Sequence, residues 1–149
     1  ACEAALRKRT SMSVYGTDYD TPDGTGVRDY IHINDLVDAH LQALRYLRKG
    51  GGPLVANCGY GKGYSVLDII EAVRRATNTD FHVDYAPRRP GDASLVVADS
   101  TLAKQVLEWT PRYDDLGVIV NTALAWERRL EEQATPDIED LRRRLASGF

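Results

Sequence analysis

The chain has 149 residues, of which 43% are hydrophobic and 28% are charged, and its formal net charge is −3. This composition excludes a disordered chain, and the slight negative charge argues against a dedicated nucleic-acid binder. No apolar run approaches 18 residues, no signal peptide is visible, and two cysteines are too few for a disulfide framework. We therefore expect no membrane span, no metal site and a cytoplasmic location.

The first third of the chain predicts a helix, a strand, a turn and a second strand. Residues 1–9 have helical spacing but no N-cap before them, which predicts that the chain is the downstream part of a longer protein. Residues 12–15 form a short apolar run, and 22–24 are a Pro-Asp-Gly turn. Residues 27–33 alternate as in a strand.

Helices and short extended runs alternate in the remainder. Asn34 is expected to cap a helix that buries an apolar stripe and ends at glycines 50–52. Residues 54–58 predict a strand, and Ser65 is expected to cap the next helix. The stripe of the first of these helices consists of Leu36, Val37, Leu41, Leu44 and Leu47.

The last third follows the same pattern. Residues 81–85 and 95–98 predict extended segments, and Asp99 or Ser100 is expected to cap a helix that ends near residue 107. Asp114 is expected to cap a long helix, and 137–145 is a further helical candidate. The residues expected to face inward on the long helix are Leu116, Val120, Ala123, Leu124 and Trp126. The chain therefore predicts an α/β fold with few short strands, too few for a complete doubly wound sheet.

The loop at 87–92 is the first candidate site, because it contains Arg88, Arg89, Pro90, Gly91 and Asp92. Two guanidinium groups on a loop stiffened by proline suit a phosphate or diphosphate, which accepts paired hydrogen bonds. A carboxylate beside them suits sugar hydroxyls. The alternative is an exposed loop with local salt bridges.

Arg28 is the second candidate, because it places a charge in a strand rich in β-branched and aromatic residues. Alternation puts Arg28 and Tyr30 on one face of that strand. An arginine next to a tyrosine can hold an anion and stack on the ring. The alternative is a strand-end salt bridge.

A third run, residues 59–65, lies between a predicted strand and a helix, as a phosphate-binding loop does. Its glycine spacing matches neither GxGxxG nor GxxxxGK[ST]. We interpret it as a glycine turn that leads to the Ser65 cap.

Four runs, in this order and spacing, resemble the C-terminal part of the UDP-glucose 4-epimerases, which are extended short-chain dehydrogenase/reductases. They are residues 12–16, GTGVRDYIHINDL, LVANCGYGKGYSVLDII and APRRPGD, and the resemblance extends to about Glu127. It implies an α/β substrate-binding portion over residues 1–132 that lacks the N-terminal Rossmann sheet. We expect residues 133–149 to be a helical tail extension, which lies beyond what the motifs cover and whose role is open. In this family a bound NAD takes hydride from C4 of the sugar and returns it to the other face, which interconverts UDP-glucose and UDP-galactose.

The resemblance implies nine substrate-binding positions: Ser13, Val14, Tyr15, Arg28, Tyr30, Arg89, Pro90, Gly91 and Asp92. The segment 13–15 matches the strand that lies along the uracil, and Tyr30 belongs to the motif of Arg28. Arg28 and Arg89 match the two arginines that grip the diphosphate, and Asp92 matches the acidic residue near the ribose. Val96 is a departure, because some members have a tyrosine there and its hydroxyl contact is lost.

The family's NAD fingerprint, GxxGxxG, and its Tyr-x-x-x-Lys pair are both missing from the sequence. We therefore expect no catalytic residue, no NAD binding by this chain alone, and only weak binding of a UDP-sugar. The expected protein partner is a second copy or the missing N-terminal half. Two alternatives stay open: a truncated, non-catalytic binding or self-association module, and part of a related UDP-sugar epimerase or decarboxylase.

Overall fold

The computed structural model describes residues 1–134, and the helical candidate at 137–145 lies outside this part. The described chain is α/β, with short strands and several helices, as predicted. No helix in it is long and apolar enough to cross a membrane. In chain order the elements are α1 (Cys2–Ala5), β1 (Met12–Tyr15), β2 (Val27–Arg28), α2 (Ile33–Arg48), β3 (Tyr64–Ser65), α3 (Val66–Thr77), β4 (Val83–Ala86), β5 (Leu95–Val96), α4 (Thr101–Val106) and α5 (Leu116–Ala134).

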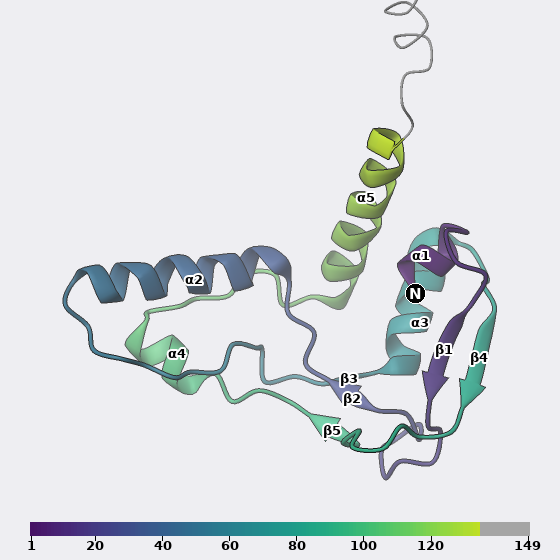
Figure 1. Ribbon diagram of the computed structural model, residues 1–149, viewed down its shortest axis with the longest axis horizontal. Coiled ribbons are helices and arrows are strands. Elements are labelled where there is room, and N and C mark those ends of the chain that lie inside the picture. Colours follow the sequence, from purple (N-terminus) through teal and green to yellow (C-terminus); the bar gives the residue numbers. More distant parts are fainter. Residues whose placement is uncertain (135–149) are drawn as a thin grey trace, which may run out of the picture.

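The strands form two small sheets. β1 and β4 run parallel, with Met12 opposite Val83 and Tyr15 opposite Ala86. The second sheet has the order β3-β2-β5, in which β2 pairs antiparallel with β3 and parallel with β5. Figure 1 shows the second sheet below the middle of the molecule, between the β1–β4 pair and the long helix α2.

The main core lies where α1, α3 and α5 pack with β1. Its most buried side chains are Val14, Ile70, Val73 and Leu124, each at most 2% exposed. Ser65 caps α3 as predicted: its hydroxyl accepts from the Asp68 N–H, and the Asp68 carboxylate accepts from the Ser65 N–H. This reciprocal pair satisfies two backbone donors at the start of the helix.

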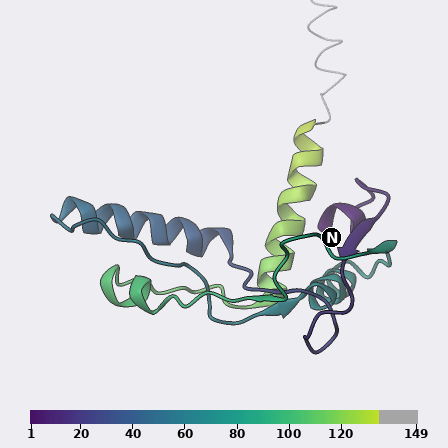
Figure 2. The ribbon, with the colours of Figure 1, turned by 60° about the horizontal axis from the view of Figure 1, so that its bottom comes forward.

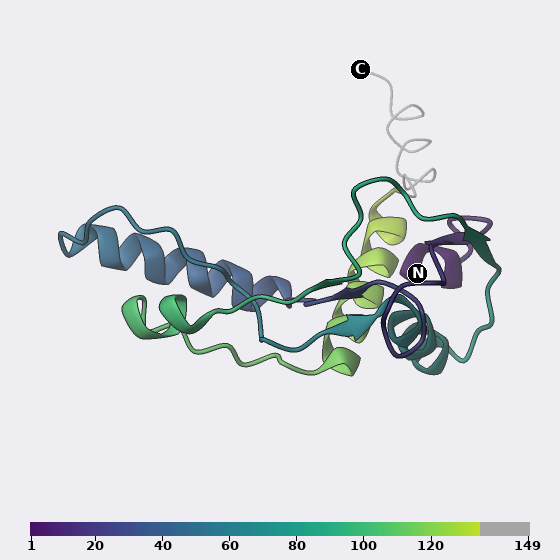
Figure 3. The same cartoon turned by 90° about the horizontal axis from the view of Figure 1, so that it is seen from below.

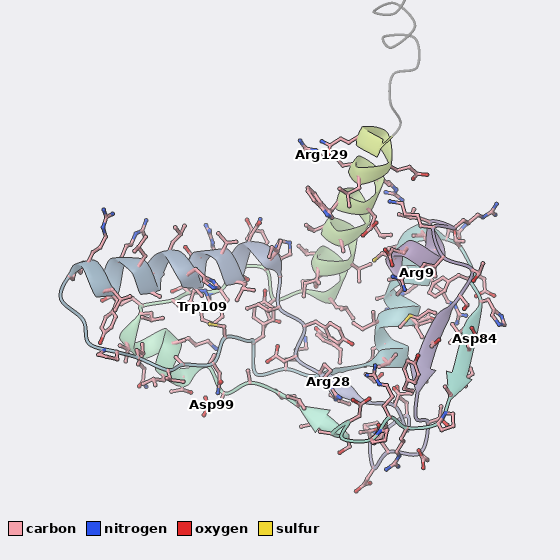
Figure 4. The ribbon with its side chains drawn as sticks, in the orientation of Figure 1. Arg9, Arg28, Asp84, Asp99, Trp109 and Arg129 are labelled. Atoms are coloured by element: carbon pink, nitrogen blue, oxygen red, sulfur yellow. The ribbon has the colours of Figure 1, made fainter. Side chains whose placement is uncertain are left out.

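A second, smaller core holds together what we call the arm, which consists of α2, residues 53–58 and α4. Trp109 is almost fully buried between α2 and α4 (Figure 4), and it packs with Ala39, Ala103 and Leu107. Its indole N–H donates to the Asp35 carbonyl at 3.0 Å. α2 and α4 extend together to one side, away from the main core, in each view (Figure 2 and Figure 3).

The predicted inward stripe of α2 is wrong. Four of its five residues, Val37, Leu41, Leu44 and Leu47, are about half exposed, with exposed fractions between 48% and 54%. The helix instead packs through a different face, on which Ala39 is buried and Ala43 and Tyr46 are partly buried. On α5, Val120 and Leu124 are buried as predicted, whereas Ala123 and Trp126 are exposed. The amphipathic pattern is real, but the apolar side chains of this stripe stay about half exposed in the described part of the chain.

Strand and cap positions also differ from the predictions. The strand expected over 27–33 ends at Arg28, and no strand forms at 54–58. The N-cap of α2 is His32, whose Nδ1 accepts from the Asn34 N–H, so Asn34 does not cap the helix. At the start of α5 the Asp115 carboxylate, not that of Asp114, accepts from the Val118 N–H.

The exposed apolar stripe predicts that the purified chain self-associates. Large exposed apolar patches are uncommon on monomeric soluble proteins, and burying one is favourable. We expect light scattering to report species larger than a monomer at micromolar concentration, together with binding of a dye that fluoresces on apolar surfaces. A clean monomer without dye binding would contradict this prediction.

Candidate functional site

The candidate site begins where the parallel strands β1 and β4 end together. Because both strands run in one direction, the chain leaves the sheet at neighbouring points, after Tyr15 and after Ala86. A hollow of about 540 Å³ lies here, lined by residues 16–18 and 85–88. Crevices at the carboxyl ends of parallel strands are common ligand sites in α/β proteins.

Two arginines from the loop after β4 stack on two tyrosines from the segment around the end of β1. The Arg89 guanidinium lies 4.6 Å from the centre of the Tyr15 ring, and that of Arg88 lies 4.1 Å from the Tyr19 ring. Arg88 is also paired with the Asp18 carboxylate at 2.6 Å. Gly16 permits this packing, because a Cβ there would lie 2.5 Å from the Tyr19 ring and 2.7 Å from Arg88, and its φ is +84°.

Arg89 and Asp92 form a local ion pair, with 2.9 Å between Arg89 Nε and Asp92 Oδ2. This contact is the local salt bridge of the alternative interpretation. The ion pair uses the Nε–H of Arg89, which is one of the five N–H donors of the planar guanidinium. The Arg89 side chain is 60% exposed, so the remaining donors face water. The loop thus presents a cation stacked on an aromatic ring, with a carboxylate beside it.

Arg28 lies next to this loop, on β2 (Figure 4). Its Nη1 donates to the Val27 carbonyl at 2.7 Å and its Nη2 to the Ala93 carbonyl at 2.9 Å. The second bond ties Arg28 to the residue that follows Asp92. Tyr15, Arg89 and Asp92 are therefore linked by direct side-chain contacts, and Arg28 joins them through the backbone carbonyl of Ala93. These contacts differ from the strand-end salt bridge of the alternative interpretation, because both Nη groups of Arg28 donate to backbone carbonyls.

Of the other predicted site residues, Val14 and Tyr30 are less available to a ligand, whereas Ser13, Pro90 and Gly91 are exposed. Val14 is 1% exposed and its side chain belongs to the main core, whereas Ser13 is exposed on the same strand. Tyr30 lies beyond the end of β2, so strand alternation does not align it with Arg28, and burial raises the pKa of its phenol. Pro90 and Gly91 are exposed at the tip of the loop.

Asp29 is an organising residue that the sequence analysis did not select. Its carboxylate accepts the N–H groups of Tyr60 at 3.0 Å, Gly61 at 2.9 Å and Ala98 at 3.3 Å. A Cβ on Gly59 would lie 2.6 Å from Asp29 Oδ2, so a glycine is needed for this approach. Asp29 thereby fixes the glycine turn and the segment after β5 against the strand that carries Arg28. In the sequence, the acidic residue directly after Arg28 and the glycine at position 59 could have indicated this role of Asp29.

Asp35 is a second such residue, and it is 1% exposed. Its carboxylate accepts from the Tyr60 hydroxyl at 2.6 Å, from the Arg112 N–H at 2.9 and 3.1 Å, and from the Tyr113 N–H at 2.8 Å. Burial alone would raise the pKa of Asp35, but these hydrogen bonds outweigh it and lower the pKa below the ordinary value. Burial and then the bond to Asp35 raise the pKa of Tyr60. Asp35 and Tyr60 together therefore join α2, the glycine turn and the segment before α5.

Comparison with known proteins gives concordant matches. The model of the NAD dependent epimerase/dehydratase family matches residues 2–59. The UDP-glucose 4-epimerase of Azospirillum brasilense is 48% identical over 132 residues, which cover 89% of this chain and 38% of that protein. The chain is related to the UDP-glucose 4-epimerases. It spans about two fifths of the length of the relatives that it matches.

Solved structures of UDP-glucose 4-epimerases agree with this relationship. The enzyme of Stenotrophomonas maltophila, with bound NAD and formylated UDP-arabinopyranose, is 37% identical with a TM-score of 0.82, over 89% of this chain and 39% of that one. The enzyme of Bifidobacterium longum, in complex with NAD+ and UDP, is 38% identical with a TM-score of 0.79, over 86% of this chain and 38% of that one. The fold of the described residues is thus that of part of an extended short-chain dehydrogenase/reductase epimerase.

Proposed function

We propose that this chain is the C-terminal, UDP-sugar-binding part of a UDP-glucose 4-epimerase-like enzyme. The observation that carries the proposal is the contact series from Tyr15 through Arg89 and Asp92 to Arg28 at the carboxyl ends of two parallel strands. A diphosphate would take the outward donors of Arg89, and the ribose hydroxyls would donate to Asp92. The uracil would lie along the outer edge of β1, near Ser13 and Tyr15.

The residues of this chain do not fit NAD. A dinucleotide site needs free backbone N–H groups in a glycine-rich turn that opens a helix. Residues 59–63 lie in that context, just before α3, but the N–H groups of Tyr60 and Gly61 are bonded to the Asp29 carboxylate. The start of α3 is closed by its own capping box. We therefore assign NAD binding and the catalytic pair to the part of the enzyme that this chain does not match.

Calorimetric titration tests the proposal. We expect the full chain to bind UDP and UDP-glucose at sub-millimolar affinity or weaker, and both more tightly than free glucose, because the cationic donors face the diphosphate. Added salt should weaken the binding, since the site is open to solvent. Tighter binding of glucose than of UDP would overturn the assignment.

A further prediction is that the isolated chain does not interconvert UDP-glucose and UDP-galactose, even with added NAD. The chemistry needs a hydride acceptor and a base held against the sugar, and the sequence lacks both the nucleotide fingerprint and the Tyr-x-x-x-Lys pair. A coupled assay that detects galactose formation should report only its background rate. Turnover proportional to the amount of purified chain would contradict this.

The identity of the sugar is a second question, because related enzymes handle different UDP-sugars. The Stenotrophomonas maltophila structure, for example, contains a formylated UDP-arabinopyranose. We propose that this chain sets affinity for the UDP moiety, whereas the unmatched part of the enzyme selects the sugar. Similar affinities of this chain for UDP-glucose, UDP-galactose and UDP-arabinose would support that division, and a tenfold or larger preference would contradict it.

A further inference from the structure

The two adjacent arginines of the loop after β4 have different surroundings. Arg89 lies over Tyr15, and its side chain is 60% exposed. The Arg88 guanidinium lies 4.1 Å from the centre of the Tyr19 ring, and its Nε lies 2.6 Å from Asp18 Oδ1. A second N–H group of this guanidinium donates to the Asp18 carbonyl. We call these contacts of Arg88 the clamp, and they leave Arg88 fewer free donors for a ligand.

The loop that supplies both partners of the clamp, the β1–β2 loop at residues 16–26, holds its own shape. The Tyr19 N–H donates to the Gly24 carbonyl at 2.9 Å. The Asp23 carboxylate accepts from the N–H and the hydroxyl of Thr25, at 2.8 and 2.7 Å. Tyr19 and Thr25 are both buried. A loop that is closed by internal hydrogen bonds and buried side chains is a firm support for the clamp.

The β4–β5 loop, residues 87–94, has little of this internal support. Among the described residues, the one backbone hydrogen bond inside it joins the Asp92 N–H to the Arg89 carbonyl at 3.2 Å. Residues 87–91 are all exposed. Figure 1 shows this loop beside the β1–β2 loop, below the ends of β1 and β4. Side-chain contacts therefore hold its first half, and the clamp is the contact that ties it to the β1–β2 loop.

We propose that Arg88 is a positioning residue of the UDP site, whose clamp keeps Arg89 stacked on Tyr15 before the diphosphate arrives. This inference rests on the proposed function. Arg88 and Asp18 neutralise each other, so Arg88 acts by holding the loop and not by attracting the ligand. Ordering a long side chain and its loop during binding lowers affinity, and a loop that is ordered beforehand avoids this loss.

Removal of Asp18 separates positioning from direct binding, because the two roles predict changes of opposite sign. If Arg88 bound the diphosphate itself, Asp18→Ala would free its donors and remove a negative charge, and UDP would bind more tightly. Under the proposal, loss of this exposed ion pair loosens the clamp and weakens UDP binding about two- to fivefold. Asp20→Ala is the matched control. Asp20 is exposed on the same loop and makes no hydrogen bond or ion pair within residues 1–134, so its removal should not weaken the binding.

Variants of Arg88 test the clamp from its other side. Arg88→Ala removes the stack as well as the ion pair, and should weaken UDP binding about three- to tenfold. Arg88→Lys keeps a cation at this position and should recover part of the loss. Arg112→Ala is the control, because Arg112 is also exposed and lies over a tyrosine ring, 5.9 Å from that of Tyr113, but outside both loops. Calorimetric titration of the full chain measures the affinities, and a thermal melt of each variant verifies its fold.

Trypsin tests the clamp without any ligand. The protease cleaves after arginine and lysine but not before proline, so within the run Arg88-Arg89-Pro90 it can cut only after Arg88. The guanidinium must leave the clamp to enter the protease. Cleavage after the exposed Lys62 is the reference in the same sample. Relative to it, cleavage after Arg88 should be about two- to fivefold faster in Asp18→Ala than in the wild-type chain, and unchanged in Asp20→Ala.

Three results would overturn this inference and leave the proposed function in place. They are unchanged or tighter UDP binding by Asp18→Ala, unchanged binding by Arg88→Ala, and equal rates of cleavage after Arg88 in the wild-type and Asp18→Ala chains. A wild-type chain that does not bind UDP would instead remove the proposed function, and the role of Arg88 with it.

Discussion

Replacement of Asp35 by alanine is expected to lower the free energy of unfolding by about 3–5 kcal/mol. The carboxylate is 1% exposed and accepts hydrogen bonds from the Tyr60 hydroxyl and from the N–H groups of Arg112 and Tyr113. Without it, these partly buried donors lose their acceptor, and the side-chain contacts of α2 to the N–H groups before α5 are lost. Urea unfolding followed by circular dichroism measures the difference.

Two variants make this prediction specific. Tyr60→Phe removes one of the bonds to Asp35, and with it the bond that the Tyr60 hydroxyl accepts from the His32 N–H. It leaves the other donors to Asp35 in place and should cost less, about 1.5–3 kcal/mol, as for a hydrogen bond to a charged group. Asp38→Ala removes a carboxylate from the same helix that accepts a 3.5 Å hydrogen bond from Gln42, and should change stability by less than about 0.5 kcal/mol. Equal effects of Asp35→Ala and Asp38→Ala would show that Asp35 has no special structural role.

The pH dependence has a defined sign. The pKa of Asp35 is lowered in the folded chain, so its contribution to stability is present above the unfolded value of about 4 and is lost as the pH falls through the folded value. The stability difference between the wild-type chain and Asp35→Asn should therefore be largest near neutral pH and shrink below about pH 4. A difference that is constant from pH 7 to pH 3 would contradict this account.

Local patterns in the sequence predicted local structure well. The strand at 12–15 and the Ser65 cap of α3 follow from short-range features: an apolar run closed by a glycine, and a serine three residues before an acid. The buried face of α3, with Ile70 and Val73, also follows from helical periodicity. In each case the residues that determine the element lie within it or beside it.

Two of the failures lie in the arm, where the apolar face of α2 and the strand predicted at 54–58 have no covering or pairing partner among the described residues. The periodicity of α2 identified an apolar face correctly, but it carries no information on which polypeptide covers that face. The helix packs internally through Ala39 and its neighbours, and the stripe through Leu41 stays exposed. Residues 54–58 have the alternation of a strand, but a strand is assigned by its pairing, and no pairing partner is present in the described residues.

The sequence analysis selected the charged loop of the candidate site, but it did not select Asp29 and Asp35, which hold the surrounding segments together. Arg89 and Asp92 stand in a recognisable run, and Tyr15 was selected with the strand that the structure places beneath Arg89. Asp29 and Asp35 were not selected, because their donors come from distant segments: Gly61 lies 32 residues from Asp29, and Tyr113 lies 78 residues from Asp35. No local pattern encodes such a contact.

Replacement of Arg89 by alanine is expected to weaken UDP binding roughly ten- to a hundred-fold. A charge-assisted hydrogen bond contributes about 1.5–3 kcal/mol, and about 1.4 kcal/mol corresponds to a factor of ten in affinity. The fold should be unaffected, because the side chain is 60% exposed and its ion pair with Asp92 lies at the surface. Calorimetric titration, with a thermal melt of each variant, measures both quantities.

Arg75→Ala is the matched control. Arg75 is 68% exposed and pairs with Glu71 within one helix, as Arg89 pairs with Asp92 within one loop, but it lies on α3 and outside the loop at 87–92. We expect this variant to bind UDP like the wild-type chain, whereas Arg89→Lys should fall between wild type and Arg89→Ala, because lysine keeps the charge and loses the planar fork of donors. Added salt should reduce the affinity of the wild-type chain more than that of Arg89→Ala. Equal affinity of the wild-type chain and Arg89→Ala would remove the diphosphate assignment and leave residues 87–92 as an exposed loop held by local salt bridges.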